Sequence, residues 1–175
     1  MSKARVAILR TRPDTVLADY ASLLELAGCG DELDCDAPTI LKVNISWQRW
    51  FPACSTTPWQ LEGVTRALLQ RGLPKEKLCA CQNRTVVVSA RKGEVANAHL
   101  PVVRACGIQN VHLYDKGEKW VHVREAVGDL ADEFLALGEI YPKGFHIPAR
   151  LIGSNIVHLP TVKTHVFTTI TGAMK

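Results

Sequence analysis

Short apolar runs and amphipathic stretches alternate along this chain. The runs have the length and the β-branched or aromatic content typical of strands. They are Arg5–Leu9, Thr39–Val43, Leu78–Cys81, Thr85–Val88, Val111–Tyr114, Trp120–Val123 and Asn155–Leu159. Polar turn residues separate most of them, so the runs are predicted to be separate strands, except that Thr85–Val88 either continues the Leu78–Cys81 strand after a break or pairs beside it.

Two helices are predicted from caps and apolar stripes. The first is expected to begin at the N-cap Asp14 and to run to about Ala27, with Gly28 as its stop. The second begins at Thr57-Pro58-Trp59-Gln60, where a threonine N-cap precedes a proline in the first turn and Gln60 completes a capping box. Gly72 is expected to end this second helix.

A third helix is predicted over Glu94–Cys106, with Gly107 as its stop. Pro101 lies inside it, so the helix is expected either to be kinked or to begin near Leu100. A helical turn is predicted within Pro148–Gly153. Strand runs that alternate with amphipathic helices predict an α/β fold, with a mainly parallel sheet flanked by helices. We interpret residues 1–175 as one such domain, and an incomplete one.

Composition and charge narrow the class of protein. The chain has 175 residues, of which 47% are hydrophobic and 22% charged, as in ordinary globular domains. Its apolar runs are too short for a membrane span, and the first one is too short for a signal-peptide core. We therefore expect a cytoplasmic protein that makes no membrane contact. The formal net charge of +4 comes from scattered residues, which argues against nucleic acid and is compatible with a small anionic ligand.

The six cysteines do not form a recognisable metal or disulfide motif. No C-x-x-C is present, and without a secretory signal we expect reduced thiols. Cys79 and Cys81 are two residues apart, so on a strand both point to one face. Metal or cluster binding by the cysteines remains an alternative. The common phosphate-loop, nucleophile-elbow, zinc-protease and dinucleotide motifs are absent from the sequence.

The polar cluster after the last strand run is the main candidate site. The apolar run stops at Pro160, and the chain then presents a cation, an imidazole, several hydroxyls and a glycine. These residues are Lys163, Thr164, His165, Thr168, Thr169, Thr171 and Gly172. Lys163 offers charge for an anion and His165 titrates near neutral pH, so these two are the candidate catalytic residues. Gly172 would let backbone N–H groups approach an anion if a helix begins there. The alternative is an ordinary polar connection between a strand and a helix.

Two further clusters are candidates for ligand binding. The Thr39–Val43 run also contains a lysine, Lys42, and is followed by the polar residues Asn44 and Ser46. It therefore repeats the pattern of an apolar strand that leads into polar side chains. Thr56 and Thr57 precede the second helix, whose N-terminus carries partial positive charge. Lys42 could instead lie on an edge strand with its amine in water, and the two threonines could be plain caps. We expect Lys163, His165 and the helix N-terminus at Thr57 to converge on one hollow above the sheet.

The chain resembles the domain of unknown function 362 family. The resemblance rests on Lys42-Val43-Asn44, on Thr56-Thr57-Pro58, and on a K-T-H … T-G-A-x-K pattern over residues 163–175. In that family the chain continues past the final lysine into a C-terminal half. The resemblance therefore implies that residues 1–175 are the N-terminal part of a longer domain. Some members carry ferredoxin-type cysteine motifs, which this chain lacks, so no cofactor is implied.

A fainter resemblance links the chain to the first domain of the nickel-pincer-nucleotide lactate racemase family. It rests on Thr57-Pro58 with its helix and on the stretch 72–78. That family has T-R-P-T-P and G-T-H-R segments, where this chain has Ser55-Thr56-Thr57-Pro58 and Cys81-Gln82-Asn83-Arg84. With these departures the resemblance implies a shared scaffold, not the nickel cofactor.

Three functions remain open from the sequence. The favoured hypothesis is an enzyme, or part of one, that binds a small anionic molecule at strand carboxyl ends through Lys42 and Lys163. The second is an iron–sulfur, metal or redox protein that uses its thiols. The third is a non-catalytic assembly module, in which the aromatic loop Trp47–Trp59 binds a second copy of the chain or a missing C-terminal half.

Overall fold

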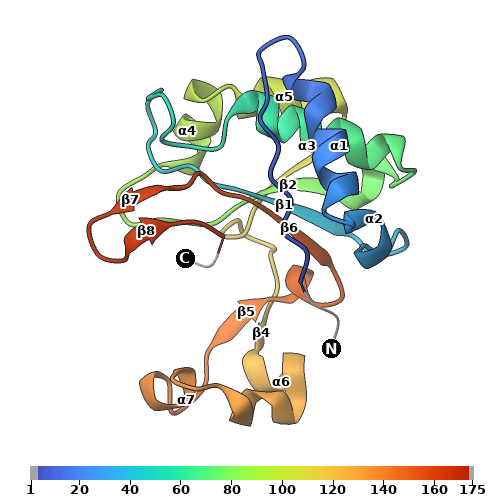
Figure 1. Ribbon diagram of the computed structural model, residues 1–175. Helices are drawn as coiled ribbons and strands as arrows, with labels where there is room; N and C mark the ends of the chain where they lie inside the picture. Colours follow the sequence, from blue (N-terminus) through green and yellow to red (C-terminus); the bar gives the residue numbers. More distant parts are fainter. Residues whose placement is uncertain (1–3, 174–175) are drawn as a thin grey trace.

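A four-stranded parallel sheet forms the centre of the protein (Figure 1). The computed structural model describes residues 4–173. In the order β3-β2-β1-β6, the strands of the sheet are Gln109–His112, Leu78–Gln82, Thr39–Val43 and Asn155–Leu159. This confirms the α/β prediction, and β1 and β6 have the bounds that their apolar runs predict.

The strand order reverses beside β1. From β1 the chain passes through α3 (Pro58–Gln70) to β2, and through α4 (Ala90–Ala96) and α5 (His99–Cys106) to β3. It then returns to pair β6 with the opposite side of β1. Since all four strands are parallel, their carboxyl ends lie at one edge, and the crevice between β1 and β6 is where ligands bind in such sheets.

Helices cover one face of the sheet and enclose the main core (Figure 1). α1 (Val16–Leu26) packs on α3, where Gly63 allows close approach of the Tyr20 ring. The sheet contributes Leu41, Val43, Leu78, Ala80 and Leu159 to this core, and α3 contributes Leu61, Val64, Ala67 and Leu68. Burial of these apolar side chains is the main favourable term that holds the helices on the sheet.

The opposite face carries a smaller apolar cluster. It consists of Ile40, Cys79, Cys81, Val111 and Leu113, with Leu151 packed against it. The prediction that Cys79 and Cys81 share one face is confirmed, because successive side chains of β2 alternate between the two faces. The same alternation directs Lys42, which follows Leu41 on β1, toward this second face.

Capping residues and glycines in the sequence predicted most helix ends correctly. Thr57 caps α3 by accepting a hydrogen bond from the Gln60 N–H at 3.3 Å. The first helix is a correction, because its N-cap is Thr15 and not Asp14. A short helix, α2 (Cys29–Glu32), follows Gly28, which has a φ of +73°.

The predicted helix over 94–106 is two helices, α4 and α5. The break lies at Asn97 and Ala98, and α5 begins at His99, close to the start near Leu100 that Pro101 indicates. Pro101 is tolerated because it lies in the first turn of α5, where an N–H has no partner within the helix. Gly107 ends α5 with a φ of +67°.

Two predicted strands are wrong. Arg5–Leu9 has no strand pairing, and its side chains Val6 and Ile8 are 84% and 91% exposed. Thr85–Val88 is a loop in which the Thr85 hydroxyl accepts from the Val88 N–H at 3.1 Å and donates to the Val88 carbonyl at 2.9 Å. Such local side-chain bonds to the backbone compete with strand pairing.

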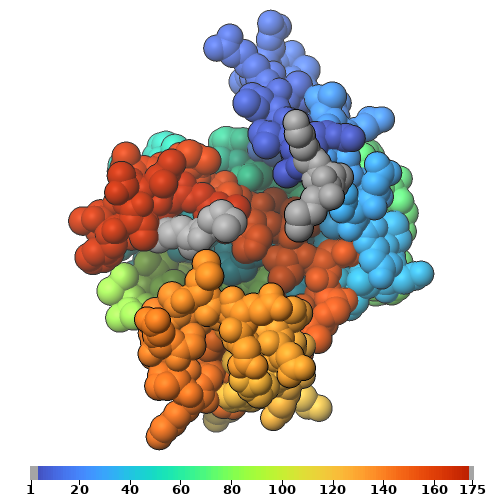
Figure 2. All heavy atoms as spheres, turned by 60° about the horizontal axis from the view of Figure 1, so that its bottom comes forward, coloured from blue at the N-terminus to red at the C-terminus, as the bar shows by residue number. Residues whose placement is uncertain are grey.

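Residues between β3 and β6 form a lobe that projects from the body (Figure 2). It is built on the antiparallel pair β4 (Trp120–His122) and β5 (His146–Pro148), with α6 (Val123–Val127) and α7 (Leu137–Ile140) between them. The 3₁₀ turns among residues 4–173 are η1 (Lys75–Lys77), η2 (Gly128–Glu133) and η3 (Ala149–Leu151). The last of these confirms the helical turn predicted within 148–153. No helix within residues 4–173 has the length and apolar character needed to cross a bilayer.

The chain reaches residue 173 through a β-hairpin. β7 (Lys163–His165) pairs antiparallel with β8 (Thr169–Thr171), and no helix begins at Gly172 within the described residues. The segment that follows Pro160 is thus a β-hairpin, whereas whether a helix begins at Gly172 depends on residues outside the described range. The last two residues of the T-G-A-x-K pattern, Met174 and Lys175, lie outside the described residues.

Candidate functional site

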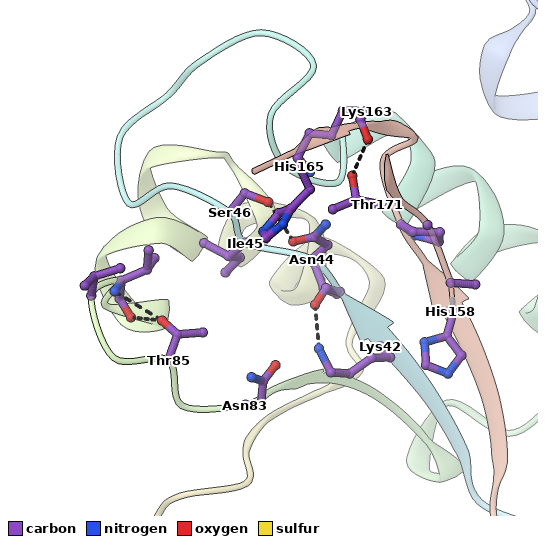
Figure 3. Close-up of a pocket in the computed structure, with 16 residues that line it drawn as sticks. Lys42, Asn44, Ile45, Ser46, Asn83, Thr85, His158, Lys163, His165 and Thr171 are labelled. Carbon is purple, nitrogen blue, oxygen red and sulfur yellow. Dashed lines mark hydrogen bonds between the residues drawn. The ribbon is translucent and has the colours of Figure 1, made fainter. Parts of the chain in front are cut away.

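A cavity of about 590 Å³ lies at the carboxyl edge of the sheet, where the strand order reverses (Figure 3). The ends of β1, β2 and β6, the loop after β2 and the terminal hairpin all contribute to its wall. Its polar lining residues are Lys42, Asn44, Ser46, Asn83, Thr85, His158, Lys163, His165 and Thr171. Val43, Ile45, Val87, Val88, Pro160, Gly172 and Ala173 complete the wall.

Lys42 lies in the middle of the sheet edge. In the strand register it faces Cys81 on one side and His158 on the other. Its amine donates a hydrogen bond to the carbonyl of Val43 at 3.0 Å. Desolvation by burial lowers the pKa of Lys42 below its ordinary value. The alternative of an edge strand is wrong for this lysine, because β1 is paired on both sides.

The segment after β1 is held in a fixed shape beneath the hairpin. The Ser46 hydroxyl donates to the side-chain oxygen of Asn44 at 3.0 Å, and the Ser46 N–H donates to the Ser55 hydroxyl at 3.2 Å. Because the Asn44 oxygen accepts from Ser46, its amide group presents N–H donors elsewhere. Asn44 and Ser46 thus supply polar groups to the cavity from a short, tied segment.

The hairpin brings Lys163 and His165 to the cavity together. They alternate with Thr164 on β7, so both are half-buried while Thr164 is exposed on the other side. Thr171 lies opposite Lys163 in the pairing, and its hydroxyl donates to the Lys163 carbonyl at 2.9 Å. The expectation that Lys163 and His165 face the same side of an extended segment is confirmed.

The His165 ring has a defined orientation. Its Nδ1 accepts hydrogen bonds from the backbone N–H groups of Phe167 and Thr168, at 3.1 and 3.4 Å. In the neutral ring the proton is therefore on Nε2. The hairpin turn thus fixes one nitrogen of the imidazole, and with it the orientation of the ring.

Five predicted ligand-binding residues do not line the cavity. Thr57 caps α3, and Thr164, Thr168 and Thr169 are exposed on the hairpin. Thr56 is fully buried, and its hydroxyl accepts from the Asn44 N–H at 2.9 Å and donates to the Leu159 carbonyl. Its role here is structural, since it joins the carboxyl ends of β1 and β6. The expected convergence therefore includes Lys163 and His165 but not the N-terminus of α3.

The buried His99 supports the same junction. Its Nε2 donates to the backbone carbonyl of Thr56 at 2.6 Å, and burial lowers the pKa of its imidazole. The side chain is almost completely buried, as expected for a histidine that packs within the protein. Thr56 is thus held by both its side chain and its carbonyl.

Sequence reasoning missed three residues of the cavity. Asn83 follows β2 just as Asn44 follows β1, a repeated signal that could have identified it. Thr85 was assigned to a strand. His158 lies within an apolar strand run, yet it is exposed beside Lys42 and lines the cavity. Only the pairing of β1 with β6 brings His158 to Lys42.

The two thiols on β2 do not have the character of metal ligands or nucleophiles. Burial raises the pKa of Cys79 to about 11 and that of Cys81 to about 12, so both are protonated at neutral pH. Across residues 4–173 no three or more His, Cys, Asp or Glu side chains are grouped closely enough to hold a metal ion. These observations give the thiol-based hypothesis no support.

Comparison with known proteins gives one family. Residues 39–175, well over half of the chain, match the family model described as Domain of unknown function (DUF362). Neither the curated proteins nor the solved structures gave a match. The match begins at the first residue of β1 and covers every residue that lines the cavity.

Proposed function

The chain belongs to the DUF362 family, and we propose that its cavity binds a small anionic molecule at the carboxyl ends of β1 and β6. The family description records no activity, so the proposal rests on the residues themselves. Both the location and the chemistry of the cavity support it.

The positive charge of the cavity wall is the main observation that supports the proposal. Two lysines and two histidines line it, and no aspartate or glutamate among residues 4–173 does so. The remaining polar groups are amides and hydroxyls, which can donate hydrogen bonds. A wall of this composition attracts an anion and offers no carboxylate to bind a cation. Burial of Lys42 adds to this, because an anion beside its amine offsets the loss of water around the charge.

The proposal includes a chemical role for the two hairpin residues. Lys163 supplies a positive charge, and the Nε2–H group of His165 donates to the ligand while Nδ1 is held by the turn. An imidazole whose ring is oriented in this way is suited to proton transfer with a bound ligand. We propose Lys163 and His165 as the residues that bind and protonate the ligand.

The test is binding of simple anions to the purified chain. Inorganic phosphate, sulfate and short carboxylates are titrated by isothermal calorimetry into the native protein, Lys163→Met and His165→Ala. The matched control is Lys92→Met, which removes an exposed lysine of α4 outside the cavity. We expect saturable binding that is about tenfold weaker in the two cavity variants, the loss of one charge-assisted hydrogen bond. Equal affinities in Lys163→Met and Lys92→Met would refute the proposal.

Exposed aromatic side chains favour self-association as a second candidate function. Trp47, Trp50, Phe51 and Trp59 are 45%, 51%, 63% and 44% exposed. The loop is nonetheless anchored, because the Asn97 amide donates to the Trp47 carbonyl at 3.1 Å. Exposed aromatic rings on an anchored loop are typical of interfaces. Light scattering across a concentration series tests this, and a constant monomer mass would rule it out.

A further inference from the structure

We infer that the ligand of this cavity carries two separate anionic groups joined by a short carbon chain, as a dicarboxylate does. This inference rests on the proposed anion site and specifies its substrate class. It comes from the arrangement of the cavity's cationic groups, which form two lysine–histidine pairs on different elements.

The first pair belongs to the sheet. Lys42 of β1 and His158 of β6 are register partners on adjacent parallel strands, so their side chains project from the same face. Asn83, at the end of β2, lies on the same side of the cavity (Figure 3). An anionic group here meets an ammonium, an imidazole and an amide.

The second pair belongs to the hairpin. Lys163 and His165 are two residues apart on β7 and share one face. Ser46 and Asn44 lie beneath them, and Figure 3 shows the His165 ring directed toward these two residues. The two pairs come from different segments of the chain, and Figure 3 shows them at different ends of the cavity, with Asn44 between them.

The cavity also has apolar lining. Its wall includes the side chains of Val43, Ile45, Val87, Val88 and Pro160. An apolar spacer fits these side chains, and a cavity of about 590 Å³ has more room than a single small anion fills. A molecule with an anionic group at each end uses both pairs at once.

The experiment compares ligands that differ by one charge. Succinate and its half-amide succinamate have the same length and nearly the same shape, and glutarate and glutaramate form a second matched pair. Calorimetry on the native chain is expected to give at least about tenfold tighter binding of each diacid, the loss expected for one charge-assisted hydrogen bond. Phosphoglycolate, in which a phosphate replaces one carboxylate, then tells which anionic group the cavity prefers.

Variants assign the two ends. Lys42→Met and Lys163→Met are each expected to reduce diacid affinity to that of the half-amide, while Lys92→Met leaves it unchanged. If the half-amide binds as tightly as the diacid, the inference is wrong but the anion site stands. If no anion in either panel binds, both fail. The wild-type comparison needs no variant, so it holds even if a substitution impairs folding.

Discussion

Thr56 offers the sharpest test of how this structure is held together. The sequence suggested a ligand-binding threonine, but the structure buries its side chain completely. Its hydroxyl accepts from the Asn44 N–H at 2.9 Å and donates to the Leu159 carbonyl, and so joins the segments that follow β1 and end β6. Thr56→Val keeps the shape of the side chain and removes only the hydroxyl.

The expected cost follows from the two groups left without a partner. Each buried donor or acceptor that loses its hydrogen bond costs about 1–3 kcal/mol. Two such groups predict that Thr56→Val lowers the free energy of unfolding by roughly 2–6 kcal/mol. That is a large fraction of the total stability of an ordinary domain.

Thr65→Val is the matched control. Thr65 is equally buried, and its hydroxyl donates to the Leu61 carbonyl at 2.6 Å within α3. That carbonyl keeps its helical N–H partner after the substitution, so we expect a cost of about 1 kcal/mol or less. Urea unfolding followed by circular dichroism measures both variants. Equal losses in the two would show that Thr56 does not join the strands in the way described.

Three further outcomes are expected. Burial lowers the pKa of Lys42, so this amine binds fewer protons in the folded chain than in the unfolded one below its ordinary value of 10.5; its own contribution to the unfolding free energy should therefore rise with pH toward 10.5, measured as the difference in urea unfolding between the native chain and Lys42→Met. With raised thiol pKa values of about 11 and 12, Cys79 and Cys81 should resist a thiol reagent at pH 8 until urea is added, and labelling at the rate of an exposed cysteine would contradict this. In Gly63→Ala the new Cβ would lie 2.5 Å from the Tyr20 ring, so urea unfolding should show a loss of about 1–3 kcal/mol despite better helix propensity.

Local signals predicted much of the fold. The bounds of β1 and β6, the Thr57 cap and the stops at Gly72 and Gly107 are all set by interactions among neighbouring residues. The same kind of information failed where a segment needs a distant partner. Arg5–Leu9 has the composition of a strand, but no strand pairs with it in the described part of the chain.

The sequence by itself determined the α/β class, the polar ends of two strands, and the pairing of Lys163 with His165 on one face of an extended segment. It could not determine which threonines bind a ligand and which hold the backbone, because the residue type is threonine whether the hydroxyl is buried or accessible. Only the tertiary structure set the strand order, and with it the position of His158 beside Lys42. The physical reason is that register between strands so far apart in sequence is fixed by packing of the whole sheet, not by the residues adjacent to either one.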